Sequence, residues 1–352
     1  MSFQDGMAAI NLQMPPRVPR TEYSAHEHWD LVEVVTGIDV SKDSPADVRA
    51  RASTQFMRAW NYDLMWSTLI FGGEFGRFRT DMGHASYNAG GGDFRPAGEQ
   101  LFADPEQVLR FDPEQTFGPR NRKELVARFD AHYRGNAAAW PFGVNMTGTY
   151  ITLVSGLIDL LGWDMLLLAA GTDAKRFGEL ANRYARWMQP FFDGLAESAA
   201  PVVMVHDDIV WSSGAFLRPD WYRQYVFPNY HNYLRPLRDA GKKILFTSDG
   251  NYTEFVDDIV AAGVTGLVME PMTDMAYIAE KYGQTLAFVG NADTRILLTG
   301  TRAEIRAEVE RCMAIGKGCP GFFMAVGNHI PANTPVANAV YYNQVVEELS
   351  KR

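Results

Sequence analysis

Short apolar runs that end in polar residues recur along the chain from residue 142 onward. Each run holds four to six apolar residues without alternation with polar ones, a pattern typical of strands buried on both faces. We therefore predict strands in residues 142–148 (FGVNMTG), 202–209 (VVMVHDDI), 243–250 (KILFTSDG), 265–272 (TGLVMEPM), 285–293 (TLAFVGNAD) and 321–330 (GFFMAVGNHI).

Segments with helical spacing separate these runs. Residues 221–239 keep that spacing despite Pro228, residues 252–262 stop before a glycine, and residues 302–315 start at Thr301 and stop at Gly316. Strands that alternate with helices predict a parallel sheet. At 352 residues, and without a G-x-G-x-x-G motif after the first strand, the pattern favours a single (β/α)8 TIM barrel over an open sheet.

The whole chain, residues 1–352, reads as one barrel domain without a low-complexity linker or tandem repeat. We expect residues 1–60 to form an N-terminal helical extension that caps the barrel. Residues 70–120 form a long insertion rich in glycine and proline. Because loops of this length in compact domains usually serve a site, we expect the insertion to cover the active site.

Composition narrows the class of protein. A net charge of -9, with no run of Lys or Arg, argues against binding of nucleic acid. Two cysteines, and an N-terminus unlike a signal peptide, favour the reducing cytoplasm. The most apolar stretch, residues 151–171, contains Asp159 and Asp164, so we expect buried helices there and no membrane span.

Candidate chemistry gathers where the predicted strands end, which is the active-site face of a parallel barrel. Solubility does not explain why carboxylates should close buried strands, whereas a catalytic rim does. A first candidate strand, residues 60–66, adds Tyr62 and Asp63. The candidate catalytic residues are Asp63, His84, Tyr150, His206, Asp208 and Asp293, and the candidate metal ligands are Asp249, Glu270 and His329.

Structural interpretations of single residues stay open beside these functional ones. Asp249 precedes Gly250 and Asn251, so it can be a turn or N-cap residue. Glu270 precedes a proline and can be an exposed loop residue, and His206 can be a core histidine with satisfied hydrogen bonds. The set of strand ends therefore indicates a site more strongly than any one member.

Three segments of the sequence resemble motifs of the uroporphyrinogen-decarboxylase superfamily. Residues 202–229 (VVMVHDDIVWSSGAFLRPDWYRQYVFPN) are similar to its strand ending in Asp followed by L-x-P-x-x-Y and a later proline. Residues 144–157 (VNMTGTYITLVSGL) resemble its G-P-x-T-L-A stretch, and residues 327–346 resemble its closing P-G-T-P-x-E-N motif. The resemblance covers roughly residues 140–350, and the N-terminal third matches only through PPRVPR (15–20).

Within this superfamily, the decarboxylases carry an arginine-rich M-R-Q-A-G-R loop that grips the carboxylates of the substrate. Here the corresponding segment reads PPRVPRTEYSAHEHW, and Arg17 and Arg20 alone are a poor substitute for such a clamp. The resemblance therefore favours the corrinoid-dependent methyltransferase branch. It implies methyl transfer between a small donor, such as an O-methyl ether, and a separate corrinoid protein. A decarboxylase, or a methyltransferase with tetrahydrofolate or a thiol as acceptor, stays the alternative.

Several members of that branch bind zinc through a His-x-Cys pair and a late Cys. Those positions correspond here to Thr247, Asp249 and Asn328, so the thiolate ligands are absent. Asp249, Glu270 and His329 would instead form a harder oxygen and nitrogen site for zinc. A second set, Asp293, Glu308 and His329, has an acid-x14-Glu-x20-His spacing similar to that of ether-cleaving methyltransferases. Without metal, His206 or His329 would act as general acid.

One further motif, DAHYRG at residues 130–135, matches the cobalamin signature D-x-H-x-x-G. It ends a predicted helical segment before a barrel strand, and the chain has no room for a second, Rossmann-like domain. We therefore expect a partner protein, rather than this chain, to hold the corrinoid. The identity of the methyl donor and the formation of a homo-oligomer stay open.

Overall fold

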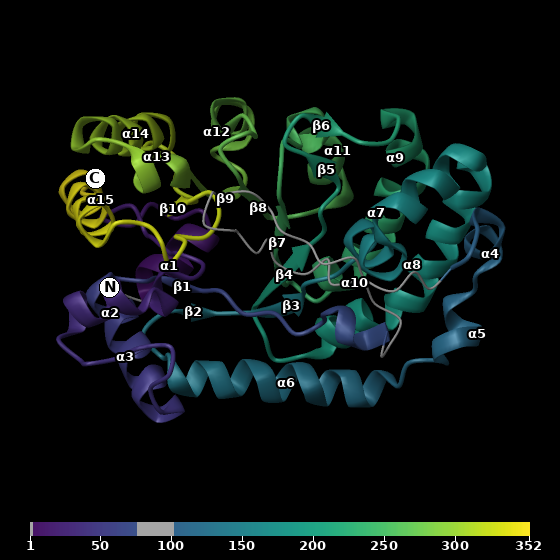
Figure 1. Ribbon diagram of the computed structural model, residues 1–352, viewed down its shortest axis with the longest axis horizontal. Coiled ribbons are helices and arrows are strands. Elements are labelled where there is room, and N and C mark those ends of the chain that lie inside the picture. The colour runs from purple at the N-terminus through teal and green to yellow at the C-terminus, as the bar shows by residue number, and fades with distance from the viewer. Residues whose placement is uncertain (1–2, 76–101) are drawn as a thin grey trace.

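The structure, a computed structural model, describes residues 3–75 and 102–352. Six parallel strands form its central sheet, in the order β10-β9-β8-β7-β4-β3 (Figure 1). The strands are β3 (Thr147–Thr149), β4 (Val202–His206), β7 (Lys243–Ser248), β8 (Gly266–Met269), β9 (Ala287–Ala292) and β10 (Phe322–Val326). All lie within the predicted apolar runs except β3, which extends one residue past its run. The prediction of parallel strands buried on both faces is thus confirmed.

Shorter contacts continue this sheet into a barrel. β1 (Leu64–Met65) pairs in parallel with β2 (Val144–Asn145), which leads through one residue into β3. Arg20 forms single parallel bridges to Tyr62, just before β1, and to Met324 in β10. The strands thus follow one another around a ring, from the Arg20 segment through β1 and onward to β10, as in a (β/α)8 TIM barrel.

The N-terminal region contributes to this ring as well as capping it. Its helices are α1 (Phe3–Ile10), η1 (Ala25–Glu27), α2 (Trp29–Thr36) and α3 (Ala46–Ala59). Ala9 and Ile10 of α1 join a buried cluster with barrel residues such as Val144 and Phe323. Gly6 lies against the Asp63 carbonyl, at the amino end of the barrel, where a Cβ atom would clash with that oxygen. α1 therefore closes the amino end of the barrel, opposite the carboxyl ends of the strands.

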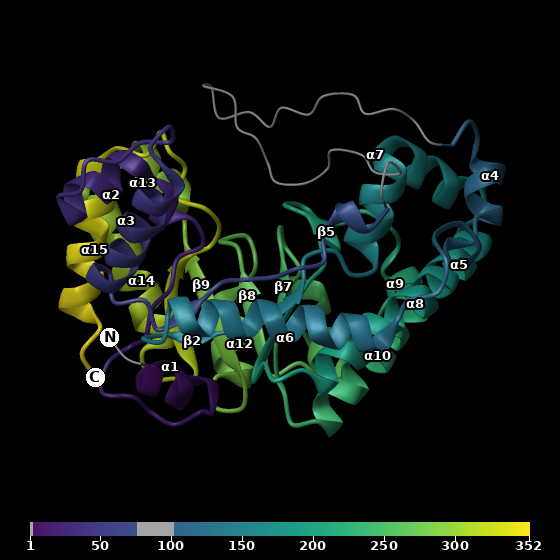
Figure 2. The same ribbon diagram turned by 90° about the horizontal axis from the view of Figure 1, so that it is seen from below.

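An outer layer of helices surrounds the strands (Figures 1 and 2). The predicted helix over residues 221–239 is instead two helices, because Pro228 has no backbone N–H and lies in the first turn of the second one. The outer helices are α4 (Pro105–Arg110), α5 (Pro113–Phe117), α6 (Arg122–Ala139), α7 (Val154–Thr172), α8 (Ala174–Glu197), α9 (Pro219–Tyr225), α10 (Phe227–Asp239), α11 (Val256–Ala262), α12 (Met275–Tyr282), α13 (Thr294–Thr299), α14 (Arg302–Gly316) and α15 (Val336–Leu349).

Helix α7 is the one described helix long and apolar enough to cross a membrane, yet 67% of its most apolar stretch is buried inside the protein. Asp159 in this helix is 7% exposed. The start of α7 is held by Asp207, whose carboxylate accepts hydrogen bonds from the backbone N–H groups of Leu153, Val154 and Ser155. α7 is therefore packed as a core helix of the barrel.

Candidate active site

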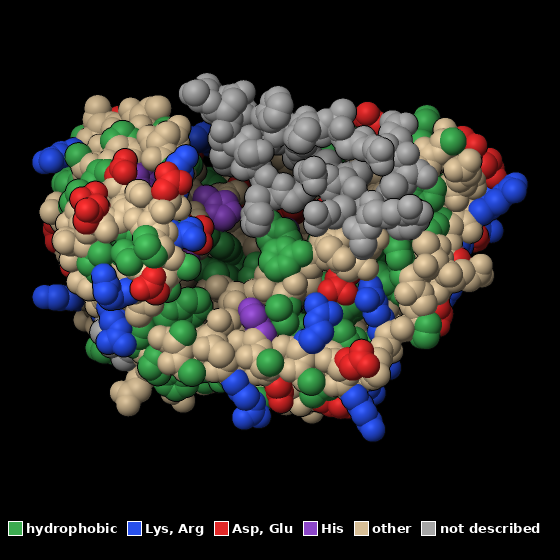
Figure 3. Space-filling model, turned by 60° about the horizontal axis from the view of Figure 1, so that its bottom comes forward, with side chains coloured by type: hydrophobic (Ala, Val, Ile, Leu, Met, Phe, Trp, Pro, Cys, Tyr) green, Lys and Arg blue, Asp and Glu red, His purple; other side chains and the backbone are tan. Residues whose placement is uncertain are grey.

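A cavity of about 380 Å³ lies at the carboxyl ends of the strands. In the space-filling view, this side of the molecule is hollowed beside the grey atoms, with hydrophobic side chains in the recess (Figure 3). The lining residues are Tyr23, Ser24, His26, Glu27, Trp66, Ser67, Thr68, Phe71, Tyr150, Met204, His206, Thr247, Ser248, Asp249, Val268, Met269, Gly327, Asn328 and His329. The size lies within the range of small-molecule sites, roughly 300–1,000 Å³.

Aromatic rings form two stacks in the walls of this cavity. On one side the rings of Tyr23 and Trp66 stack with centroids 4.4 Å apart and an angle of 12° between their planes. On the other, Tyr150 stacks on His206 at 4.3 Å and on Phe71 at 4.8 Å. Burial raises the pKa of Tyr23 and of Tyr150 far above the usual range of a phenol. Both phenols therefore stay neutral at physiological pH.

His206, the last residue of β4, is held in a defined tautomer. Its Nδ1 lies 2.6 Å from the carbonyl oxygen of Tyr150, which can only accept a hydrogen bond, so Nδ1 carries the proton. Nε2 then points to Asp208, 3.4 Å from Oδ1. Fixing one ring nitrogen on a backbone carbonyl leaves the other free for a proton, a metal or a substrate.

Asp249 completes a cluster with His206 and Asp208. Ligand atoms of the three residues lie within 4.8 Å of one another. Among the described His, Cys, Asp and Glu side chains, this is the group that lies close enough together to hold one metal ion. The Asp249 N–H donates to Asp208 Oδ1 at 2.9 Å. Asp249 is exposed as a whole, yet desolvation of its carboxylate by the cavity wall, and next the negative charges of Asp208 and Glu270, raise its pKa above the usual value. The site therefore favours a protonated Asp249 or a bound positive charge.

Glu270 lies beside this cluster but is already engaged by its neighbours. Oε2 accepts a hydrogen bond from the Gly250 N–H at 2.6 Å, and Oε1 accepts one from Asn328 Nδ2 at 2.5 Å. Asn328 Oδ1 in turn accepts from the backbone N–H of His329 at 2.7 Å. Glu270 thus ties together the loops that follow β7, β8 and β10.

The predicted site residues divide into those inside and those outside the main cavity. Tyr150, His206, Asp249 and His329 line it, and Asp208 contacts His206. Glu270 and Asp293 line a neighbouring cavity of about 220 Å³, which also includes His329. Asp249, Glu270 and His329 do not bring three ligand atoms within 4.8 Å of one another, because the Glu270 carboxylate is taken up by Gly250 and Asn328.

Two further predictions lie elsewhere. Asp63 is fully buried outside both cavity linings, where it accepts hydrogen bonds from Arg17 at 2.5 Å and from the Arg20 backbone N–H at 3.0 Å. This pairing indicates a structural role at the N-terminal side of the barrel wall. His84 lies outside the described residues.

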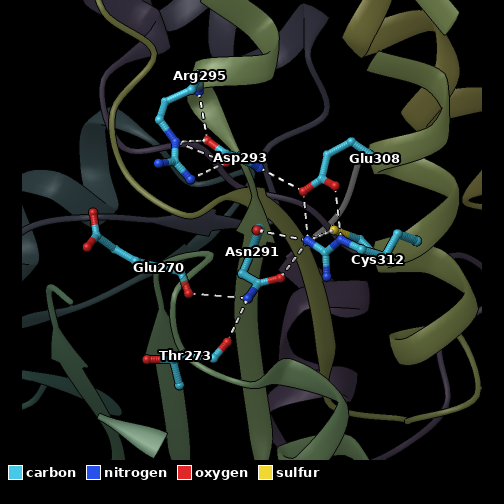
Figure 4. Close-up of polar contacts among 8 residues, drawn as sticks. Glu270, Thr273, Asn291, Asp293, Arg295, Glu308 and Cys312 are labelled. Carbon is cyan, nitrogen blue, oxygen red and sulfur yellow. Dashed lines mark hydrogen bonds and ion pairs between the residues drawn. The ribbon is translucent and has the colours of Figure 1, made fainter. Parts of the chain in front are cut away.

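The second predicted metal set, Asp293, Glu308 and His329, has arginine partners for both carboxylates (Figure 4). Arg295 Nη2 lies 2.6 Å from Asp293 Oδ2. Arg311 donates to both oxygens of Glu308, at 2.9 and 2.7 Å. Glu308 also accepts the Asp293 backbone N–H at 2.9 Å, so this group anchors the start of α13 to α14. Its carboxylates are committed to ion pairs.

Some residues of the cavity wall were not predicted from the sequence. Tyr23 lies in the segment expected to be a cap, and the run TEYSAHEHW, dense in histidine and aromatic residues, was the available signal. Ser67 lines the cavity and lies 2.8 Å from His132 Nε2, while His132 Nδ1 lies 2.8 Å from Thr147 Oγ1. The D-x-H-x-x-G histidine therefore supports the barrel wall from α6, and burial lowers its pKa.

The described cavity contains no cationic clamp: none of its lining residues is Lys or Arg. Arg17 pairs with Asp63, and Arg20, which is 2% exposed, pairs with Glu22 at 2.9 Å and contacts Asn343. Both arginines of the N-terminal motif thus serve the barrel wall. A substrate with several carboxylates finds no partner for them among the described lining residues.

Comparison with known proteins places the chain in a family. Residues 146–349 match the family described as uroporphyrinogen decarboxylase (URO-D), and the chain belongs to it. A uroporphyrinogen decarboxylase from Thermus thermophilus is 28% identical over 171 residues, 49% of this chain and 48% of that protein. One from Pelobacter propionicus is 23% identical over 175 residues, 50% of each. The chain thus spans about half the length of the curated relatives it matches.

A solved structure extends the similarity over the full chain. A methyltransferase from Methanosarcina mazei superposes with a TM-score of 0.63 and 17% sequence identity, and 99% of each chain is covered. At this identity the similarity concerns the fold. The chain is therefore a TIM barrel of the URO-D superfamily, and URO-D members are enzymes.

Proposed function

We propose that this protein is a methyltransferase that moves a methyl group between a small methylated donor and the cobalt of a separate corrinoid protein. The observation that carries the proposal is the make-up of the cavity. Its described walls combine aromatic rings with His206 and Asp249, which Asp208 contacts, and include no Lys or Arg. Such walls suit a small methylated molecule and oppose a porphyrinogen, whose many carboxylates would require cations.

The cavity also offers an acid for the leaving group. When a methyl group leaves an O-methyl ether, the bonding electrons stay on oxygen, which needs a proton or a positive charge. A protonated Asp249 or an Nε2-protonated His206 can supply that proton, and Asp208 orients His206 through the 3.4 Å contact. The neutral Tyr150 packs on His206 and limits the movement of its ring.

The zinc site of related methyltransferases does not fit these residues. Thr247, Asp249 and Asn328 stand where the thiolate-type set has His and Cys, and neither Cys312 nor Cys319 lines the cavity. Oxygen and nitrogen ligands remain in the cluster of His206, Asp208 and Asp249. We therefore derive no step through a thiolate-bound zinc ion.

A decarboxylase is the second candidate, because the curated relatives are named uroporphyrinogen decarboxylase. A direct assay separates the two functions. Purified protein is mixed with reduced cobalamin, as a stand-in for the corrinoid protein, and with O-methyl or N-methyl donors, and methylcobalamin is followed by its absorbance. We expect methylcobalamin to form and uroporphyrinogen to stay unchanged; formation of coproporphyrinogen without methylcobalamin would refute the proposal.

The same assay tests the assigned residues. Asp249→Asn removes the acid and its charge, and we expect the rate to fall roughly a hundredfold or more, within the usual contribution of a general acid. Asp43→Asn makes the same chemical change at an exposed loop position between α2 and α3 and should leave the rate unchanged. Treatment with EDTA should spare the activity if a proton, rather than a metal, serves the leaving group.

A further inference from the structure

We infer that the cavity is a binding site for an organic cation, and that the methyl donor is a methylated ammonium compound that also carries an oxygen. The inference narrows the class of methyl donor in the proposed function. Only the role of the cation as a methyl donor rests on that function. The binding of the cation itself does not depend on methyl transfer. It follows from the charge, the rings and the unpartnered polar atoms of the described lining.

The charge of the site is the first argument. Asp249 lines the cavity, Asp208 accepts a hydrogen bond from the Asp249 backbone N–H, and no described lining residue is Lys or Arg. Glu270 lines the neighbouring cavity, where Arg295, the partner of Asp293, also interacts with it electrostatically. Asp249 is exposed and the Asp208 side chain is 32% exposed, so solvent partly screens the repulsion between the two carboxylates, and a cation beside them relieves the rest.

His206 supplies a second argument, which is geometric. Since Nδ1–H donates to the Tyr150 carbonyl, a neutral His206 directs the Nε2 lone pair at the Asp208 carboxylate, 3.4 Å away. Two electron-rich atoms that face each other require a proton or a positive group nearby. A proton on Nε2 meets this requirement, and so does a cation seated against Asp208 and Asp249.

The aromatic walls select an organic cation over a metal ion. Tyr23 and Trp66 on one side, with Phe71 and Tyr150 on the other, line the same cavity as the acids. Aromatic rings attract quaternary ammonium groups through their negative faces, and this attraction is strongest for Trp.

Unpartnered polar atoms indicate that the ligand also carries oxygen. Thr247 is 6% exposed, lines the cavity, and its hydroxyl has no hydrogen-bond partner. The indole Nε1 of Trp66 is buried and equally without a partner. Buried donors of this kind are costly unless a ligand or water pairs with them. A hydroxyl group on the ligand would pair with the Thr247 hydroxyl, whose residue lines the cavity.

The reaction balances without an added reagent. The carbon–nitrogen bond of the ammonium group breaks, its electron pair stays on nitrogen, and the methyl group passes to the reduced cobalt of the proposed corrinoid partner. The amine leaves as a neutral molecule, so with this donor Asp249 acts through its negative charge, which holds the ammonium group, and not as a proton donor. Having lost its charge, the amine binds the acidic cavity less strongly and is released.

Calorimetric titration of the full chain with choline, compared with its neutral isostere 3,3-dimethylbutan-1-ol, tests the inference. The two probes share shape and hydroxyl group and differ in charge. We expect choline to bind at least tenfold more tightly. Asp249→Asn should weaken choline binding about tenfold or more through the lost charge, and Trp66→Leu should weaken it several-fold through the lost ring. Asp43→Asn should bind like the unmodified protein.

Binding of the isostere as tight as that of choline would overturn the inference, as would full affinity in Asp249→Asn. Titration with Zn²⁺ alone tests whether a metal ion occupies the cluster instead. A single Zn²⁺ site that is lost in Asp249→Asn, together with no choline binding, would assign the cluster to a metal. Circular dichroism confirms that each variant is folded. Tight choline binding without methylcobalamin formation would leave the cation site standing and refute only the proposed transfer.

Discussion

Two groups of acidic residues lie side by side at the carboxyl ends of the barrel strands, and they are partnered in opposite ways. Asp293 and Glu308 each hold an arginine and link α13 to α14. Asp249, which follows β7, lines a cavity whose described lining has no Lys or Arg, and Asp208, which follows β4, lies next to it. The first group stabilises the fold, whereas the second keeps its charge available for a ligand. Proximity to a strand end therefore does not by itself identify an acid as functional. An acid that lines a cavity and has no cationic partner is the better candidate.

The largest effect on stability should come from breaking the ion pair of Glu308 with Arg311. Arg311→Met removes both hydrogen bonds to Glu308 and leaves its carboxylate, which is 9% exposed, without a counter-charge. Because Arg311 is 39% exposed and only Glu308 is buried, we expect the free energy of unfolding to fall by about 2 kcal/mol, between the values of exposed and buried ion pairs. Urea denaturation measures the change.

A matched double variant sharpens this prediction. Arg311→Met combined with Glu308→Leu replaces the pair by apolar side chains and should recover much of the lost stability. If the single variant is as stable as the unmodified protein, the ion pair is not the anchor that the geometry indicates.

Replacement of the acid in the cavity should change the free energy of unfolding in the opposite direction. Because the folded protein raises the pKa of Asp249, its charged form is disfavoured relative to the unfolded chain, and stability is lost as the pH rises from the unfolded pKa toward the raised folded one. Asp249→Asn should therefore raise the free energy of unfolding at neutral pH, but only by about 0.5 kcal/mol, because Asp249 is exposed and solvent screens its charge. Chemical denaturation at two pH values tests this: the gain should vanish in acid, and a loss of stability at pH 7 would contradict the account.

A smaller, pH-dependent effect is expected behind the cavity wall. Burial lowers the pKa of His132 in the folded state, so its contribution is present above the unfolded pKa, near 6.5, and is lost as the pH falls toward the folded value. His132→Gln should flatten the fall of the melting temperature between pH 8 and about pH 5. His231→Gln, at an exposed position in α10, is the control; equal slopes for the two variants would exclude a buried neutral His132.

The smallest effect should come from Arg295, although it contacts Asp293 at 2.6 Å. The arginine side chain is 67% exposed, and such pairs contribute about 0–1 kcal/mol because solvent screens them. Arg295→Ala should change the free energy of unfolding by less than about 0.5 kcal/mol. A loss as large as that of Arg311→Met would show that exposure does not separate the two pairs.

The apolar runs predicted most of the barrel because each buried strand is continuous in sequence. β4, β7, β8, β9 and β10 fall inside the expected segments, and the Thr301 start of α14 is confirmed by its capping box with Glu304. The Arg20 segment could not be found in this way. It joins the barrel through single bridges to Tyr62 and Met324, too short a contact to leave an alternating or apolar pattern.

The site was predicted less completely, because ion pairing is a long-range property. Asp63 and Arg17 are 46 positions apart, so nothing local in the sequence shows that this acid, which precedes β1, is neutralised. His206, Asp208 and Asp249 lay at the predicted rim, but their grouping depends on the pairing of β4 with β7. Tyr23 and Trp66 meet only because the N-terminal segment enters the barrel wall.

The position of a bound cation tests the central claim most directly. Tetramethylarsonium has the shape and charge of a quaternary ammonium group, and arsenic gives an anomalous X-ray signal. In a crystal soaked with it, we predict one arsenic peak inside the cavity, beside Asp249 and the ring of Trp66. No arsenic peak in the cavity at a saturating concentration, or a metal ion bound by His206, Asp208 and Asp249 in its place, would contradict the account.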